Sequence, residues 1–148
     1  MNAPSIRRLE GGCHCGNIRV ALDWPEAAGP SIPVHACGCS FCRKHGAAWI
    51  SHPEGRFRLQ VADAGRVTPY RLGTETAAFQ VCATCGAVPA VTCVIEGTRY
   101  AVVNARTFDG AEGLPLVQTA TDFEGETVDA RLARRRRNWT PEAAGGEA

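Results

Sequence analysis

The residues best equipped for chemistry in this chain are its cysteines, most of which fall in three tight clusters. The chain has 148 residues and eight cysteines. The clusters have the patterns C-x-C, C-x-C-x2-C and C-x2-C, and they comprise, in order, Cys13 and Cys15; Cys37, Cys39 and Cys42; and Cys82 and Cys85. We refer to the middle cluster as the central trio. Thiolate sulfur is a preferred zinc ligand, so this pattern indicates metal binding.

The alternative interpretation of the clusters is the disulfide scaffold of a secreted protein. The first ten residues, MNAPSIRRLE, lack the apolar core of a signal peptide. No apolar run approaches the roughly 20 residues that would span a bilayer. We therefore expect a cytoplasmic protein, in which a reducing environment keeps thiols free. Two cysteines one residue apart also suit a shared metal ion better than a disulfide.

Two of the clusters can supply a closed structural site. A C-x-C pair and a C-x2-C pair each deliver two ligands from one turn, and structural zinc sites are tetrahedra of four protein ligands. Such a site could comprise Cys13, Cys15, Cys82 and Cys85. Metal binding would then offset the entropy of closing a long loop. Spacing alone leaves open which cysteines pair across clusters.

The central trio would then remain, with three ligands for a second ion. Catalytic zinc sites use three protein ligands and keep one position open for water or substrate. An open position would suit an external thiol, held there as an anion. Alternatively a histidine closes the shell; the candidates are His14, His35, His45 and His52, of which His35 and His45 are nearest in sequence. Cys93 lies in an apolar stretch, where we expect a small buried hydrophobe without a functional role.

The elements that must position these cysteines are short strands separated by turns. Alternating apolar and polar residues predict a strand over residues 17–23. Comparable patterns predict strands over residues 34–36, 47–51, 57–61, 66–72, 77–81, 88–95, 99–104 and 116–117. A brief helix could form within residues 122–133. We therefore predict a mainly β domain over residues 1–130 and a C-terminal tail over residues 131–148, first basic and then rich in Ala, Gly and Glu.

The charge pattern gives little support to a nucleic-acid or membrane partner. The chain has 16 basic and 15 acidic residues, for a net charge of +1. A balanced chain has no global attraction to phosphates or anionic lipids. The basic run from Arg134 to Arg137 can grip phosphates, but such a run is more often a solvated terminus.

The cysteine motifs and their neighbours resemble those of the glutathione-dependent formaldehyde-activating enzyme family, whose domain also occurs in centromere protein V. The matching segments are Gly12-Cys13-His14-Cys15-Gly16, Cys37-Gly38-Cys39-Ser40-Phe41-Cys42-Arg43-Lys44, and Phe79 through Cys82-Ala83-Thr84-Cys85-Gly86. The resemblance implies a β-tent fold of small antiparallel sheets pinned by a four-cysteine zinc site. It also implies two zinc ions: a structural one on Cys13, Cys15, Cys82 and Cys85, and a catalytic, more labile one on Cys37, Cys39 and Cys42.

The resemblance further implies a carbon–sulfur lyase whose partners are a small thiol and an aldehyde. In the family's named activity, glutathione and formaldehyde combine to S-hydroxymethylglutathione. The thiol, held by zinc as the thiolate, would attack the aldehyde carbon, and a nearby donor would stabilise the developing alkoxide. The alternative is a non-enzymatic zinc module that binds glutathione, a protein or nucleic acid.

Several residues are candidates for contacts with the substrate. Arg43, Lys44 and Arg71 can each meet a carboxylate, a role that suits the planar guanidinium of arginine, or can be ordinary surface charges. Trp49 can wall a pocket or fill the core. Asn104 can donate to an oxyanion or end a strand.

Overall fold

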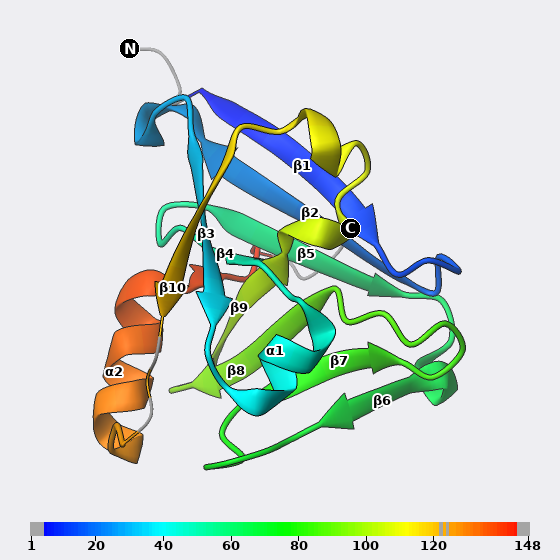
Figure 1. The fold of residues 1–148 in the computed structure, drawn as a ribbon, viewed down its shortest axis with the longest axis vertical. Helices are drawn as coiled ribbons and strands as arrows, with labels where there is room; N and C mark the ends of the chain where they lie inside the picture. Colours follow the sequence, from blue (N-terminus) through cyan, green and yellow to red (C-terminus); the bar gives the residue numbers. More distant parts are fainter. Residues whose placement is uncertain (1–4, 122, 124, 145–148) are drawn as a thin grey trace.

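The structure, a computed structural model, describes residues 5–121, 123 and 125–144. Two β-sheets pack against each other around a common core (Figure 1). The smaller sheet has the strand order β1-β2-β5 and is antiparallel throughout. Its strands are β1 (Ile6–Gly12), β2 (Ile18–Pro25) and β5 (Arg56–Val61). The alternation that predicts β2 buries Ile18, Val20 and Leu22. In contrast, we expected no strand where β1 lies.

The larger sheet has the order β10-β3-β4-β9-β8-β7-β6, and β11 also pairs with β9. Its strands are β3 (Ile32–Cys37), β4 (Trp49–Ile50), β6 (Val67–Tyr70), β7 (Ala78–Cys82), β8 (Ala90–Ile95), β9 (Thr98–Asn104), β10 (Leu116–Thr121) and β11 (Thr140–Pro141). The mainly β class of small sheets is confirmed. One pair, β3 with β10, is parallel, so the sheets are not all antiparallel as the resemblance implied.

The helices lie near the ends of this parallel pair (Figure 1). The α-helices are α1 (Ser40–His45) and α2 (Val128–Asn138), and four short 3-10 turns are η1 (Glu26–Ala28), η2 (Ala64–Arg66), η3 (Ala105–Thr107) and η4 (Ala111–Gly113). Parallel strands end at the same edge of a sheet, so the segments that follow β3 and β10 come together. Among the described residues, no helix is both long and apolar enough to cross a membrane.

The C-terminal segment packs on the larger sheet instead of forming a loose tail. Helix α2 continues to Asn138, and the boundary that we expected between residues 130 and 131 lies inside it. Trp139 and Thr140 are buried, and Thr140 pairs with Ala101 of β9. The expectation of a loose end is therefore wrong for residues 140–144, whereas residues 145–148 lie outside the described part.

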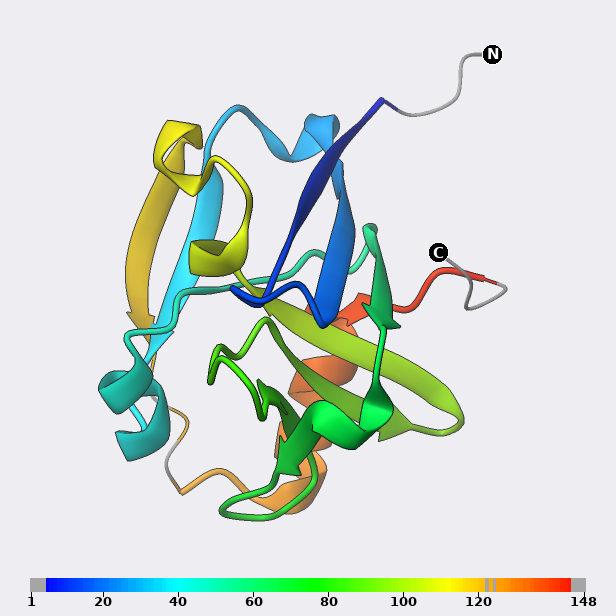
Figure 2. The same ribbon diagram turned by 90° about the vertical axis from the view of Figure 1, so that its right-hand side faces the viewer.

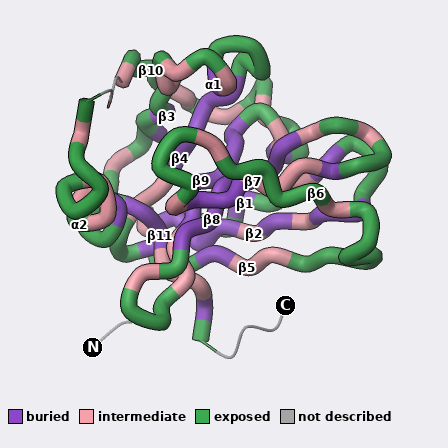
Figure 3. Tube along the Cα trace, turned by 90° about the horizontal axis from the view of Figure 1, so that it is seen from below, coloured by how far each residue is buried: buried purple, intermediate pink, exposed green. Residues whose placement is uncertain are grey.

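Strand β9 separates two hydrophobic clusters. Ala101 and Val103 face the main core, where they pack with strands of the smaller sheet. Val102, between them, faces a second cluster that contains Trp49 and Trp139. Accordingly, the smaller sheet lies on one side of β9 and α2 on the other (Figure 2). Figure 3 shows that burial is concentrated in the inner strands β2, β8 and β9. Cys93 is buried, as expected.

Candidate metal centres and the adjoining cavity

Two turns from different sheets bring four cysteines together. We refer to Cys13, Cys15, Cys82 and Cys85 as the four-cysteine group, and their sulfur atoms all lie within 4.8 Å of one another. The Sγ atoms of Cys13 and Cys15 are 3.7 Å apart, and those of Cys15 and Cys82 are 3.5 Å apart. A tetrahedral zinc with bonds of about 2.3 Å places its sulfur ligands about 3.8 Å apart. The spacing therefore fits a four-coordinate ion.

Each of the two turns of the four-cysteine group is closed by a hydrogen bond to the carbonyl of its first cysteine. In the first, the Cys13 carbonyl accepts the Gly16 N–H at 3.1 Å, and the Ile18 N–H donates to Cys13 Sγ at 3.2 Å. In the second, the Cys82 carbonyl accepts the Gly86 N–H at 2.8 Å. Gly16 and Gly86 have φ values of 87° and 81°, a conformation that favours glycine. The glycines thus let each turn fold tightly around a cysteine pair.

The central trio is formed where β3 ends and α1 begins. Cys37 is the last residue of β3, Cys39 is the N-cap of α1, and Cys42 lies within the helix. Their three sulfur atoms also lie within 4.8 Å of one another. The Cys42 N–H donates to Cys39 Sγ at 3.4 Å, and the Trp49 indole N–H donates to Cys42 Sγ at 3.3 Å. Donors aimed at sulfur favour the thiolate form that a metal requires.

Hydrogen bonding within the central trio separates the acidities of its thiols. The hydrogen bond from the Cys42 thiol lowers the pKa of Cys37 to about 5, and the positive charge of Arg134 acts in the same direction. The same bond, together with burial, raises the pKa of Cys42. The cluster therefore holds one thiolate readily before any metal binds.

No histidine completes the central trio. The structure describes all four histidines, and none contributes a nitrogen to the group of sulfur atoms. His35 Nδ1 lies 3.4 Å from the Thr119 hydroxyl, and the His45 ring packs on Phe41 with 4.3 Å between centroids. Among the described residues, the central trio therefore offers three thiols as candidate ligands. The geometry favours the open alternative over the histidine-closed one.

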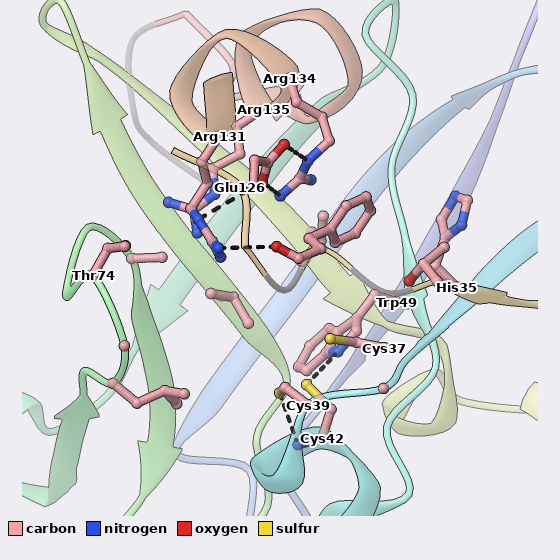
Figure 4. Close-up of a pocket in the computed structure, with 18 of the residues that line it drawn as sticks. His35, Cys37, Cys39, Cys42, Trp49, Thr74, Glu126, Arg131, Arg134 and Arg135 are labelled. Carbon is pink, nitrogen blue, oxygen red and sulfur yellow. Dashed lines mark hydrogen bonds and ion pairs between the residues drawn. The ribbon is translucent and has the colours of Figure 1, made fainter. Parts of the chain in front are cut away.

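A cavity of about 740 Å³ opens above the central trio (Figure 4). Ligand pockets in proteins commonly have volumes of about 300–1,000 Å³, so this one can hold a small molecule. The cysteines lie on one side of the cavity and α2 on the opposite side, where Arg131, Arg134 and Arg135 point into it. All eight cysteines are free, which fits metal binding rather than a disulfide scaffold.

The expected substrate-side residues divide into two sets. Arg43 and Trp49 line the cavity, and Trp49 also supports the central trio. Lys44 and Arg71 are not among the described lining residues. Asn104 is buried and its amide bonds to backbone groups, so its place in the structure matches the end of a strand rather than an oxyanion site.

The sequence interpretation missed that α2 is a wall of the cavity. The sequence predicts a brief helix within residues 122–133 and a solvated arginine run, whereas α2 spans Val128–Asn138. Arg131, Arg134 and Arg135 have the i, i+3, i+4 spacing that places side chains on one helical face. Thr127, whose side chain accepts the Ala130 N–H at 3.1 Å, caps the helix just before this face. The spacing and the cap together were a signal for an ordered helix.

Comparisons with known proteins agree with this fold and these motifs. The crystal structure of a protein from Rhodobacter sphaeroides superposes with a TM-score of 0.53 and is 26% identical. The match covers 74% of this chain and 99% of that one. The sequence model of the glutathione-dependent formaldehyde-activating enzymes matches residues 8–126, which include both cysteine groups. Since this match covers most of the sequence, the chain belongs to the glutathione-dependent formaldehyde-activating enzyme family.

Proposed function

We propose that the protein is a zinc-dependent carbon–sulfur lyase that joins a small thiol to an aldehyde, most simply glutathione to formaldehyde. The observation that carries this proposal is the placement of the central trio. Three convergent thiols lie at the wall of a cavity of about 740 Å³, with no fourth ligand among the described residues. A structural zinc site is closed by four protein ligands and does not keep an open position beside a cavity.

The residues fit zinc at both groups. Each donor set consists only of sulfur, which selects zinc over the hard cations that prefer oxygen. The four-cysteine group would hold a structural ion, and Cys37, Cys39 and Cys42 would hold the second. When bound at the central trio, zinc would supply a positive charge that lowers the pKa of an incoming thiol.

The contribution of the chain is to position the reactants. Trp49 and Phe79 give the cavity an aromatic wall beside the sulfur atoms. The substrate thiol gives up its proton to solvent and its sulfur attacks the carbonyl carbon, so a C–S bond forms and the carbonyl π electrons move to oxygen. The oxygen then takes up a proton, and the overall reaction adds the thiol across the aldehyde without any oxidation or reduction.

The test must measure exchange, because thiols add to formaldehyde without a catalyst. Magnetisation-transfer NMR with labelled formaldehyde and glutathione reports how fast the free aldehyde and S-hydroxymethylglutathione interconvert. We expect the zinc-loaded protein to raise this rate in proportion to its concentration. Cys39→Ser should return the rate to background, because it removes one ligand of the central trio.

Cys93→Ser is the matched control, since Cys93 is a buried cysteine that belongs to neither group, and the serine hydroxyl can still accept the hydrogen bond that Arg135 donates to Cys93 Sγ. It should keep both the zinc content and the exchange rate. A protein that binds glutathione but leaves the exchange rate unchanged would be a binding module instead of an enzyme. A zinc content that is the same in Cys39→Ser and the unmodified protein would contradict the metal assignment itself.

A further inference from the structure

The cavity opposite the central trio has a strongly cationic wall. Among its described lining residues, four are arginines and a single one, Glu126, is a carboxylate. Three of the arginines come from α2, and the fourth, Arg43, comes from α1. Helix α2 begins at Val128, beyond residues 8–126 that the family model matches. The charge of this wall therefore comes largely from a segment outside the common family pattern.

One position on this wall already holds a carboxylate. Arg134 grips Glu126 with two parallel contacts, Nε to Oε2 and an Nη to Oε1, each 3.0 Å long. Such a planar fork is the preferred way in which arginine binds a carboxylate. Arg131 adds a longer contact of 3.7 Å to the same carboxylate, and the Phe123 ring packs against the Arg134 guanidinium at 3.5 Å. The wall is thus shaped to hold a carboxylate group.

A second cation on the wall has no carboxylate partner in the described part of the chain. Arg135 is 7% exposed, and it donates to the Thr76 hydroxyl at 2.8 Å and to Cys93 Sγ at 3.5 Å. Its Nε is buried and finds no hydrogen-bond partner among the described residues. A buried charge is costly unless an opposite charge compensates it. An anion in the cavity would supply that compensation.

We propose that Arg131, Arg134 and Arg135 form the subsite for a carboxylate of the thiol substrate, and that Glu126 occupies this subsite until the substrate displaces it. The substrate class is then a thiol that carries its carboxylate on the side remote from sulfur. The inference rests on the proposed function, because the central trio must hold the sulfur end. Helix α2 then determines which thiols bind, and the Glu126 carboxylate competes with the substrate carboxylate for the arginines.

The test compares three probes on the full zinc-loaded chain by calorimetry. Glutathione carries both the thiol and the carboxylates, its diethyl ester keeps the thiol but lacks the carboxylate charges, and S-methylglutathione keeps the carboxylates but has no free thiol. We expect glutathione to bind roughly tenfold or more tightly than the ester, since hydrogen bonds to charged groups are strong. Arg131→Gln and Arg135→Gln should each shrink this preference.

Arg136→Gln is the matched control, because Arg136 lies on the same helix but is exposed and pairs with Glu96 at 2.9 Å. It should leave the preference unchanged. Glu126→Gln should tighten the binding of glutathione severalfold and leave the ester unaffected, because it frees the Arg134 fork. If the variant at the buried Arg135 fails to fold, the comparison of glutathione with its ester still tests the subsite. Arg131→Gln tests it as well, because Arg131 is partly exposed.

Two results would overturn the carboxylate subsite. One is equal affinity for glutathione and its diethyl ester, and the other is weaker glutathione binding in Glu126→Gln. If the central trio does not bind the thiol, the results differ from these. S-methylglutathione would then bind as tightly as glutathione, and Cys39→Ser would bind both compounds as tightly as the unmodified protein does. The experiment therefore separates an error about the thiol site from an error about the carboxylate subsite.

Discussion

Trp49 is the residue through which the larger β-sheet supports the central trio. Its indole N–H donates to Cys42 Sγ at 3.3 Å, and the side chain is 5% exposed. Groups that hydrogen bond to metal ligands typically change metal affinity by about 10–100-fold when they are removed. We therefore expect Trp49→Phe to weaken zinc binding at the central trio by about tenfold, measured by competition with a chromogenic chelator.

Trp24 provides a control of the same size and burial. It is 3% exposed, and its indole nitrogen finds no hydrogen-bond partner among the described residues. Trp24→Phe removes the same atoms from a core without taking a donor from any sulfur. It should leave zinc affinity unchanged. Equal loss of zinc in both variants would mean that Trp49 acts only by packing.

Asn104 is a structural residue according to its contacts. Its Oδ1 accepts the Ala48 N–H at 3.3 Å and the Arg106 N–H at 3.2 Å, while Nδ2 donates to the Val88 carbonyl at 3.1 Å. Buried groups that lose such partners cost about 1–3 kcal/mol. Asn104→Ala should thus lower the free energy of unfolding in urea by about 3 kcal/mol. Zinc content and thiol exchange should persist; a loss of exchange at unchanged stability would restore the oxyanion role.

At the scale of elements, the strands were more predictable than the helices. Period-two alternation marks β2 and β5 in the sequence, and the turn at residues 96–97 marks the β8–β9 hairpin, whose strands are buried on both faces where they pair. Helix α1 has only six residues, too few to show a helical period. The pairing of β3 with β10 joins segments far apart in the chain, and no local pattern reports it. Each cysteine cluster was predictable because its spacing is local, but the joining of Cys13 and Cys15 with Cys82 and Cys85 rested on the family resemblance. The cavity depends on the distant pairing of β3 with β10.

The N-cap residue Thr127 stabilises the first turn of α2. The Thr127 hydroxyl accepts the Ala130 N–H at 3.1 Å, and replacing such a cap by alanine costs about 1 kcal/mol. We expect Thr127→Ala to lower the free energy of unfolding by about this amount, and Thr127→Ser to restore most of it. Hydrogen exchange of the α2 amides should accelerate in the alanine variant while the β8 and β9 amides remain protected. Acceleration throughout the chain would mean that α2 does not open on its own.

At the scale of the whole molecule, the four-cysteine group joins the two sheets. Cys13 follows β1 of the smaller sheet, and Cys82 ends β7 of the larger one. Cys15 and Cys82 are 67 residues apart in sequence, so a metal here closes a long loop. Zinc binding at such sites contributes about 10–16 kcal/mol, which is comparable to the whole stability of a domain, about 5–15 kcal/mol. The fold of this chain should therefore depend on that ion.

The two groups should accordingly respond differently to the loss of one ligand. Cys82→Ser should abolish cooperative thermal unfolding, because the sheets lose the ion that joins them. Cys39→Ser should keep a folded protein with one zinc per chain instead of two, because the central trio lies at the end of β3 and joins only that strand to α1. Zinc analysis together with circular dichroism measures both effects. If the two variants unfold alike, the division into a structural and a catalytic ion is wrong, since both ions would then hold the fold.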